Sequence, residues 1–133
     1  MTELLGVYPD AEQVIRGVLA PLGVTLVTAT PVTMVPPLIA LTRVGGDDDG
    51  LTDHAHVEVA VFAVDRPGAW SLSERARQLV LAAPHTEVPL DTGIACIDYT
   101  IGMAAPQLVP YPDQDLRLVV AVYQLSMRRL RTT

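Results

Sequence analysis

The chain has 133 residues, half of them apolar and 18% charged, with a net charge of −6 at pH 7 and a mean hydropathy of +0.33. This length predicts a single domain, residues 1–133, and no apolar run reaches the ~20 residues that a membrane-spanning helix needs. The negative charge argues against binding to nucleic-acid phosphates or to anionic membranes. Because nine basic and fifteen acidic side chains cover a surface of this size thinly, we expect other subunits to cover part of it.

The cysteine count and the opening residues indicate the compartment. A single cysteine, Cys96, excludes an internal disulfide and fits a reducing cytoplasm. Residues 1–5 lack the basic start and the apolar core of a signal peptide. We therefore expect synthesis and assembly in the cytoplasm.

A first helix is predicted after Asp10, whose side chain can accept from the free N–H groups of the first turn. Pro21 and Gly23 end it. The apolar residues between them recur at helical spacing: Val14, Ile15, Val18, Leu19 and Leu22. Short strands are expected at 24–29 and 38–44, joined by an extended, proline-rich connection.

A glycine-bounded acidic turn, 45–54, is expected to lead into a long strand at 55–64. A second helix should begin at Asp65 or at Ser71, both of which can cap it, and should end at Pro84. After a polar loop at 85–92 come a strand at 93–103, a proline-rich loop at 105–115 and a last strand at 116–127.

The order α-β-β-β-α-β-β predicts an α+β fold, with an antiparallel or mixed β-sheet and two helices packed on one face. Alternation along the strands separates the two faces of the sheet. We assign to the helix-covered face the row from Ala55 to Ala63 and, on the last strand, Leu116, Leu118, Val120 and Val122. The opposite rows are mixed, which predicts a face that is partly wet and partly covered by a partner.

The residues that could carry chemistry form no complete site. Asp53, His54 and His56 beside the acidic turn could bind a metal, but no third histidine or glutamate follows at ligand spacing. A hydrogen-bonded ladder is the simpler interpretation. The turn also lacks the alternating acids and the closing glutamate of a calcium loop. No hydrolase, zinc-protease, redox or phosphate-binding motif is present, so we expect no catalysis, no metal and no cofactor.

Three segments resemble a known family. They are LTRVGGDDDGLTD at 41–53, VEVAVFA at 57–63 followed by WSLSERAR at 70–77, and PYPDQDL at 110–116 leading into AVYQLSMR at 121–128. In this order and spacing the chain is similar to the tail terminator, or tail completion, proteins of long-tailed, non-contractile phages, especially those that infect actinobacteria. The likeness covers about residues 8–130 and identifies the chain as a single tail-terminator-like domain.

The resemblance implies a virion protein that forms a six-subunit ring at the head-proximal end of the tail tube. Such a ring stops addition of the tube protein and offers a surface to the head–tail connector or stopper protein. DNA passes through its channel without specific binding, and an acidic wall would prevent sticking. No membrane is involved.

We assign candidate roles to three groups of residues. The acidic turn, with Asp47, Asp48, Asp49 and Asp53, is placed at the channel or at the tube-facing rim. Arg43, Arg117 and Tyr123 are candidate inter-subunit contacts. Tyr111, Asp113 and Asp115 belong to a candidate docking loop, 110–115. Two other functions stay open: a different head–tail connector or neck component, and a small acidic α+β ligand-binding or enzymatic domain.

Overall fold

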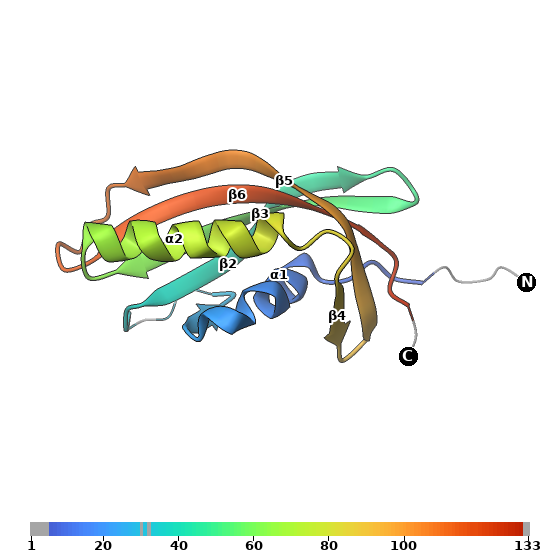
Figure 1. The fold of residues 1–133 in the computed structure, drawn as a ribbon, viewed down its shortest axis with the longest axis horizontal. Coiled ribbons are helices and arrows are strands. Elements are labelled where there is room, and N and C mark those ends of the chain that lie inside the picture. Colours follow the sequence, from blue (N-terminus) through green and yellow to red (C-terminus); the bar gives the residue numbers. More distant parts are fainter. Residues whose placement is uncertain (1–5, 30, 32, 132–133) are drawn as a thin grey trace, which may run out of the picture.

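The computed structural model describes residues 6–29, 31 and 33–131, and Figure 1 shows their arrangement. The elements follow the predicted order with one additional strand. They are α1 (Ala11–Leu19), the 3-10 turn η1 (Ala20–Leu22), β1 (Thr25–Val27), β2 (Leu38–Asp48), β3 (Thr52–Ala63), α2 (Arg66–Leu81), β4 (Glu87–Leu90), β5 (Gly93–Val109) and β6 (Arg117–Arg128).

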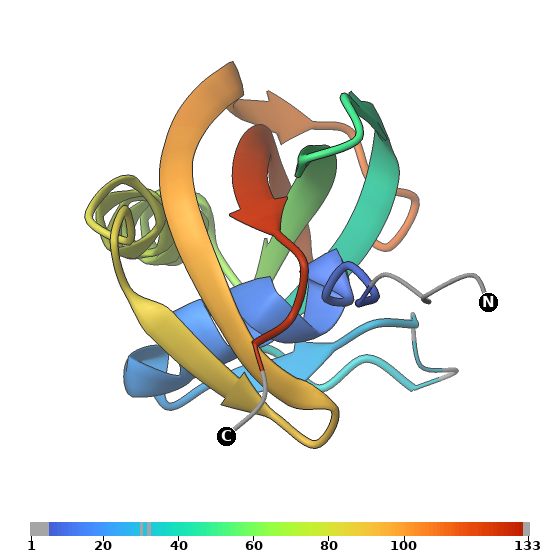
Figure 2. The ribbon, with the colours of Figure 1, turned by 90° about the vertical axis from the view of Figure 1, so that its right-hand side faces the viewer.

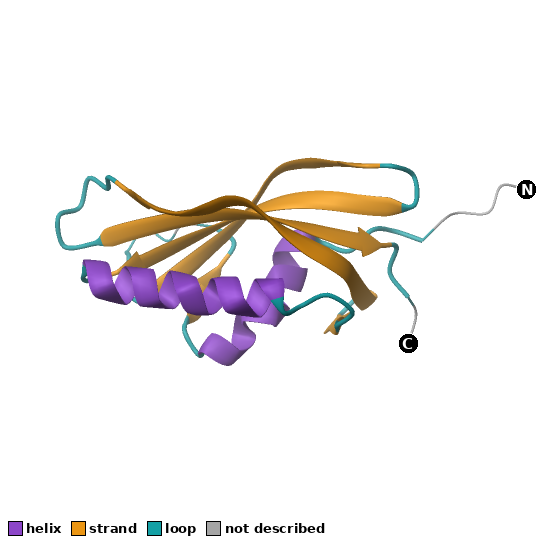
Figure 3. Ribbon diagram, turned by 45° about the horizontal axis from the view of Figure 1, so that its top comes forward, coloured by secondary structure: helices purple, strands orange, loops and turns teal. Residues whose placement is uncertain are grey.

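The strands form one six-stranded sheet in the order β1-β2-β3-β6-β5-β4. The β1–β2 pair is parallel and the other pairs are antiparallel. Both helices lie on the same face (Figure 3), which we call the inner face; the opposite one is the outer face. The predicted α+β fold is confirmed. Neither helix has the length and apolarity needed to cross a bilayer, among the residues described.

Both helices begin at the aspartates that the sequence indicated. The Asp10 carboxylate accepts from the N–H of Glu12 at 3.0 Å, and that of Asp65 accepts from the N–H of Gly68 at 2.7 Å. Of the two predicted starts for α2, Asp65 is therefore the correct one, with proline in the first turn where no N–H is needed. The helices bury Val14, Ile15, Leu19, Leu72, Ala76 and Val80 against the sheet.

Three strands, β2, β3 and β5, are longer than the sequence suggested, whereas β1 is shorter than the predicted 24–29. β2 continues through the glycines to Asp48 and β3 begins at Thr52, so that the turn comprises only residues 49–51. A register shift between Arg43 and Gly45 absorbs one extra residue as a bulge. β5 likewise runs through the predicted loop to Val109, and β4 forms within the other predicted loop. Pairing with a neighbouring strand outweighs the weak strand propensity of glycine, alanine and proline.

The assignment of the β6 rows was wrong. Val119, Ala121, Tyr123 and Leu125 lie on the inner face, at most 1% exposed, whereas Leu118, Val120 and Val122 lie on the outer face. Both rows of β6 are apolar from Leu118 to Tyr123, and only the polar Gln124 and Ser126 farther along mark the outer row. The register decides, because Val57 and Val59 pair with Tyr123 and Ala121, and paired residues project to the same face.

One end of the outer face is covered by the chain itself. Leu38, Ala40, Ala60 and Phe62 are buried there, with Met34 and Tyr111 packed against them from two loops. The sequence analysis predicted that a partner covers part of this face. At this end the chain's own loops cover it instead. The other end, toward the β2–β3 turn, carries polar side chains.

Gly46 provides a test of the extended hairpin. Its φ is +102°, and an added Cβ would collide with the carbonyl oxygen of His54. We predict that Gly46→Ala lowers the free energy of unfolding by about 2–4 kcal/mol. Gly102→Ala is the matched control in a strand, because no atom lies within 4 Å of the position that its added Cβ would take, and it should change stability by less than about 1 kcal/mol. Urea unfolding measures both; equal losses would contradict the strained position of Gly46.

Candidate assembly surfaces

The end of the β2–β3 hairpin, residues 44–56, forms what we call the hairpin arm, which extends beyond the end of α2 (Figure 3). Asp47, Asp48 and Asp49 are exposed there. The Asp48 carboxylate accepts from the N–H of Gly50 at 3.0 Å, and one oxygen of Asp49 accepts from the N–H groups of Leu51 at 3.0 Å and Thr52 at 2.8 Å. The acids therefore stabilise the conformation of the turn and also give it a negative charge.

The hydrogen bonds of the turn stabilise the ionised form of Asp49. The backbone N–H groups of Thr52 and Leu51, followed by the side chain of His54, lower the pKa of Asp49 to about 2. These bonds favour the ionised form. The Asp49 carboxylate is consequently ionised at neutral pH.

Asp53 occupies a different environment from the other three acids. It is 4% exposed on the inner face and accepts two hydrogen bonds from the Arg43 guanidinium, at 2.7 and 2.8 Å. Arg43 also donates from Nε to the carbonyl of Gly45, and its backbone N–H to Glu12. The bonds to Asp53 are the main reason that the pKa of Arg43 is raised.

This pair changes two of the predicted roles. The Asp53 carboxylate lies beneath the sheet and not at an exposed rim, and Arg43 satisfies an acid of its own chain. A bidentate arginine–carboxylate pair fixes both side chains. Its function in the structure is to tie the base of the hairpin arm together.

The other two candidate contacts also differ from one another. Tyr123 is 1% exposed within the core, which leaves no side-chain surface for a neighbouring subunit. Arg117 is exposed and donates to the carbonyls of Gln114 and Leu116. No acidic side chain lies within salt-bridge distance of it among the described residues. Arg117 therefore stays available for a neighbour's carboxylate.

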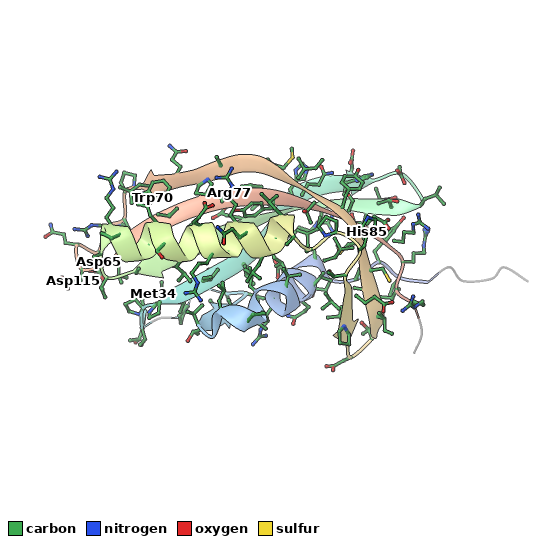
Figure 4. The ribbon with its side chains drawn as sticks, in the orientation of Figure 1. Met34, Asp65, Trp70, Arg77, His85 and Asp115 are labelled. Carbon is green, nitrogen blue, oxygen red and sulfur yellow. The ribbon has the colours of Figure 1, made fainter. Side chains whose placement is uncertain are left out.

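The predicted docking loop joins β5 to β6 at the end of the molecule opposite the hairpin arm, the end at which Figure 4 labels Asp115. Tyr111 anchors it, with its ring edge against Phe62 at a centroid distance of 5.2 Å. Asp113 accepts from the N–H of Asp115 at 2.9 Å, and both acids are exposed. A hollow of about 520 Å³ beside the loop has Arg117 as its charged lining residue.

A polar ladder crosses the outer face near the hairpin arm. His54 Nδ1 lies 2.8 Å from Ser126 Oγ and 3.4 Å from the Tyr99 hydroxyl, while its Nε2 lies 3.3 Å from Asp49. His56 Nε2 similarly lies 3.0 Å from the Gln124 side chain. The sequence indicated the histidines but not their partners, since the register of β3 with β6 was unknown.

The acid–imidazole–hydroxyl order of Asp49, His54 and Ser126 superficially resembles a hydrolase relay. However, Ser126 has no exposed surface, and its oxygen also accepts from Gln124 at 3.2 Å. A nucleophile must reach a substrate carbonyl, so this ladder is a cross-strand support. In the described parts of the chain, no three ligand-type side chains converge as a metal site would require.

The C-terminal arginines contact other segments of the chain, and one of them, Arg129, contacts the hairpin arm. Arg129 donates to the carbonyl of Gly50 at 2.8 Å and lies over the Tyr8 ring at 4.6 Å. Arg128 pairs with Asp98 at 3.3 Å, and Arg131 pairs with Glu87. The turn, the N-terminal segment and the C-terminal segment are thereby joined at one end of the sheet.

Comparison with protein families matches residues 7–133 to the family described as phage tail termination protein. The chain belongs to that family. The likeness predicted from three sequence segments is thus confirmed at the family level, and the protein is a structural component of the phage virion, located in its tail.

The fold of this tail termination protein also occurs in a solved structure. A chain of the structure described as "Virion of native gene transfer agent (GTA) particle" matches it with a TM-score of 0.57 and 10% identity. The match covers 89% of this chain and 94% of the other. No curated protein matches the sequence significantly.

The Arg43–Asp53 pair can be tested against Arg117. We predict that Arg43→Ala lowers the free energy of unfolding by about 2–3 kcal/mol, because it leaves a buried carboxylate without its partner. Arg117→Ala, which removes an exposed arginine, should cost less than about 0.5 kcal/mol. Denaturant unfolding of the two variants checks this, and equal effects would refute the structural role of the pair.

Tyr123 gives a pH-dependent prediction. Burial raises its pKa to about 12 from an ordinary 10.0. The neutral phenol is favoured in the folded chain, so this contribution is fully present below pH 10 and is lost as the pH rises toward 12. Between these values the unfolding free energy of wild type should fall more steeply than that of Tyr123→Phe. Parallel curves would show that the phenol ionises as freely as in the unfolded chain.

Proposed function

We propose that this tail termination protein forms a six-subunit ring on the head-proximal end of the tail tube. The ring ends polymerisation of the tube protein and supplies the surface to which the head–tail connector or stopper binds. DNA passes through it without specific binding. The resemblance of segments 41–53, 57–77 and 110–128 supports a long-tailed, non-contractile phage of the type that infects actinobacteria.

The observation that carries this proposal is the family match over residues 7–133, nearly the whole chain. The surfaces described above are compatible with it. They are an acidic arm, a polar ladder on an open sheet face and an anchored loop with outward acids. None of them presents the enclosed group of converging polar side chains that a ligand-binding or catalytic domain would use.

The distribution of charge supports a DNA channel. Six copies at −6 each total about −36. Asp47 and Asp49 are exposed on the arm, while Arg43 is held by Asp53 and the C-terminal arginines contact their own chain. An acidic surface of this kind repels DNA phosphates, so that DNA does not bind to the channel wall.

Reconstitution with the cognate tail tube tests the proposal. Purified protein is added to tubes assembled from the tube protein alone, and complexes are viewed by negative-stain microscopy and weighed by native mass spectrometry. We expect a ring of six copies at one end of each tube, and tubes that stop growing once capped. Uncapped tubes that continue to lengthen in the presence of excess protein would refute it.

The acidic arm gives a separate prediction. Replacement of Asp47, Asp48 and Asp49 together by lysine should lower the number of infectious particles by more than about tenfold, because the arm would then attract DNA phosphates. Replacement of the same three residues by asparagine keeps acceptors for the turn and should have a much smaller effect. Melting temperatures show whether each variant folds. Normal infectivity of the folded lysine variant would exclude a role for the arm's charge.

A further inference from the structure

An unpaired strand edge lies on one side of the sheet. β4 pairs only with the first four residues of β5, Gly93 to Cys96, whereas the pairing of β5 with β6 continues to Val109. At Ile97 the same edge still bonds to the segment before β4, since its carbonyl accepts from the N–H of His85 and its N–H donates to the carbonyl of Thr86. Among the described residues, no strand pairs with the far edge of β5 beyond Ile97. The backbone N–H and C=O groups along residues 99–109 can therefore form a ladder with another strand.

This edge lacks the charged side chains that usually protect an open strand edge against association. From Tyr99 to Val109 there is no charged residue, although exposed edges are ordinarily guarded by charges, proline or bulges. Pro106 and two register shifts lie between Gly102 and Gln107, and a third register shift lies between Ile97 and Tyr99, just before this segment. The first half exposes Tyr99, Ile101 and Met103 by 42%, 43% and 48%. Residues 99–103 are the part best suited to pairing.

The sheet has a second, shorter open edge. On β2, β1 covers only Leu38 to Ala40, and the Glu12 carboxylate occupies the outward N–H of Arg43 at 2.8 Å. Residues 44–48 are exposed beyond that point, with Val44 at 50%. Figure 2 shows β2 and β5 toward opposite edges of the sheet, with β3 and β6 between them.

The strand directions suit head-to-tail joining. The β2–β3, β3–β6 and β6–β5 pairs are all antiparallel, so β5 runs opposite to β2. Rotation about an axis along the strands preserves these directions, and it would place β2 of one copy antiparallel to β5 of the next. Two different surfaces related by such a rotation are what a closed ring needs.

We propose that the second copy of this chain is the occupant of the β5 edge. Residues 99–103 of one subunit pair antiparallel with residues 44–48 of its neighbour, and the sheet continues from copy to copy. The inference rests on the ring proposed above and identifies its interface. It also places the acidic arm beside a subunit boundary.

Photo-crosslinking tests the interface on the full chain bound to cognate tubes. A benzoyl-phenylalanine replaces Met103 in an isotopically labelled copy, which is mixed with unlabelled wild type; the control carries it in place of Val64, exposed by 66% but away from this edge. After irradiation, peptides are identified by mass spectrometry. We expect Met103, and not Val64, to capture an unlabelled peptide that contains residues 44–48.

The other outcomes are also decisive. Capture of the tube protein alone, or of β5 from another copy, would overturn this interface, and so would capped tubes with no β5–β2 product. Failure of the wild type to cap tubes would instead refute the ring itself. The two proposals therefore fail in different ways.

A charge on the edge gives an independent readout. Met103→Glu places a negative charge opposite the neighbour's segment 44–48, which carries Asp47 and Asp48, and it should lower the fraction of capped tubes by about tenfold. Val64→Glu, at an exposed apolar position away from this edge, should cap like wild type. Equal melting temperatures would show that both variants fold, and undiminished capping by folded Met103→Glu would overturn the proposal.

Discussion

The pairing of β3 with β6 is the interaction on which the rest of the structure depends. It runs without a register shift from Thr52–Arg128 to Ala63–Arg117. Because paired residues share a face, it sets Val57 and Val59 beside Tyr123 and Ala121 under the helices. The same register places His54 and His56 beside Ser126 and Gln124 on the outer face. A one-residue slip would reverse every one of these side chains.

The hairpin arm shows how that register becomes a rigid surface. The arm projects past α2, so helix packing does not support its tip. Polar contacts support the tip instead. On the inner face Arg43 donates to Asp53, and on the outer face His54 lies between Asp49 and Ser126. Arg129 donates to the carbonyl of Gly50. Hydrogen bonds to charged groups are stronger than neutral ones, and three sets of them from different directions restrict the arm to one shape. Its exposed carboxylates consequently have fixed positions.

Local signals in the sequence were sufficient for the fold class and the helices. Asp10 and Asp65 act within one turn of themselves, so their roles as caps could be read without tertiary information. The β6 faces were assigned wrongly, because both rows are apolar as far as Tyr123 and the assignment did not use the polar Gln124 and Ser126 that continue the outer row. For the same reason Tyr123 was taken for a surface contact and proves to be core. Arg43 and Asp53 are ten residues apart, and only the bulged hairpin brings them together. Asp47 to Asp49 were recognised as exposed acids, and nothing in the sequence indicated that β5 would have an unpaired edge.

If the subunits join through β5 and β2, closure of the ring explains why no further copy of this chain is added to it. Each copy has one open edge of either kind, and a closed ring uses all of them, so that no strand edge is left to recruit another copy. An open arrangement would leave an uncharged β5 edge at one end and would keep growing. The distribution of charge favours the same pairing as the strand directions do. Asp47 and Asp48 lie on the β2 edge, and two β2 edges would bring like charges together, whereas the uncharged β5 edge accepts them without repulsion. The acidic arm therefore favours head-to-tail pairing over back-to-back pairing, and head-to-tail pairing is the kind that closes.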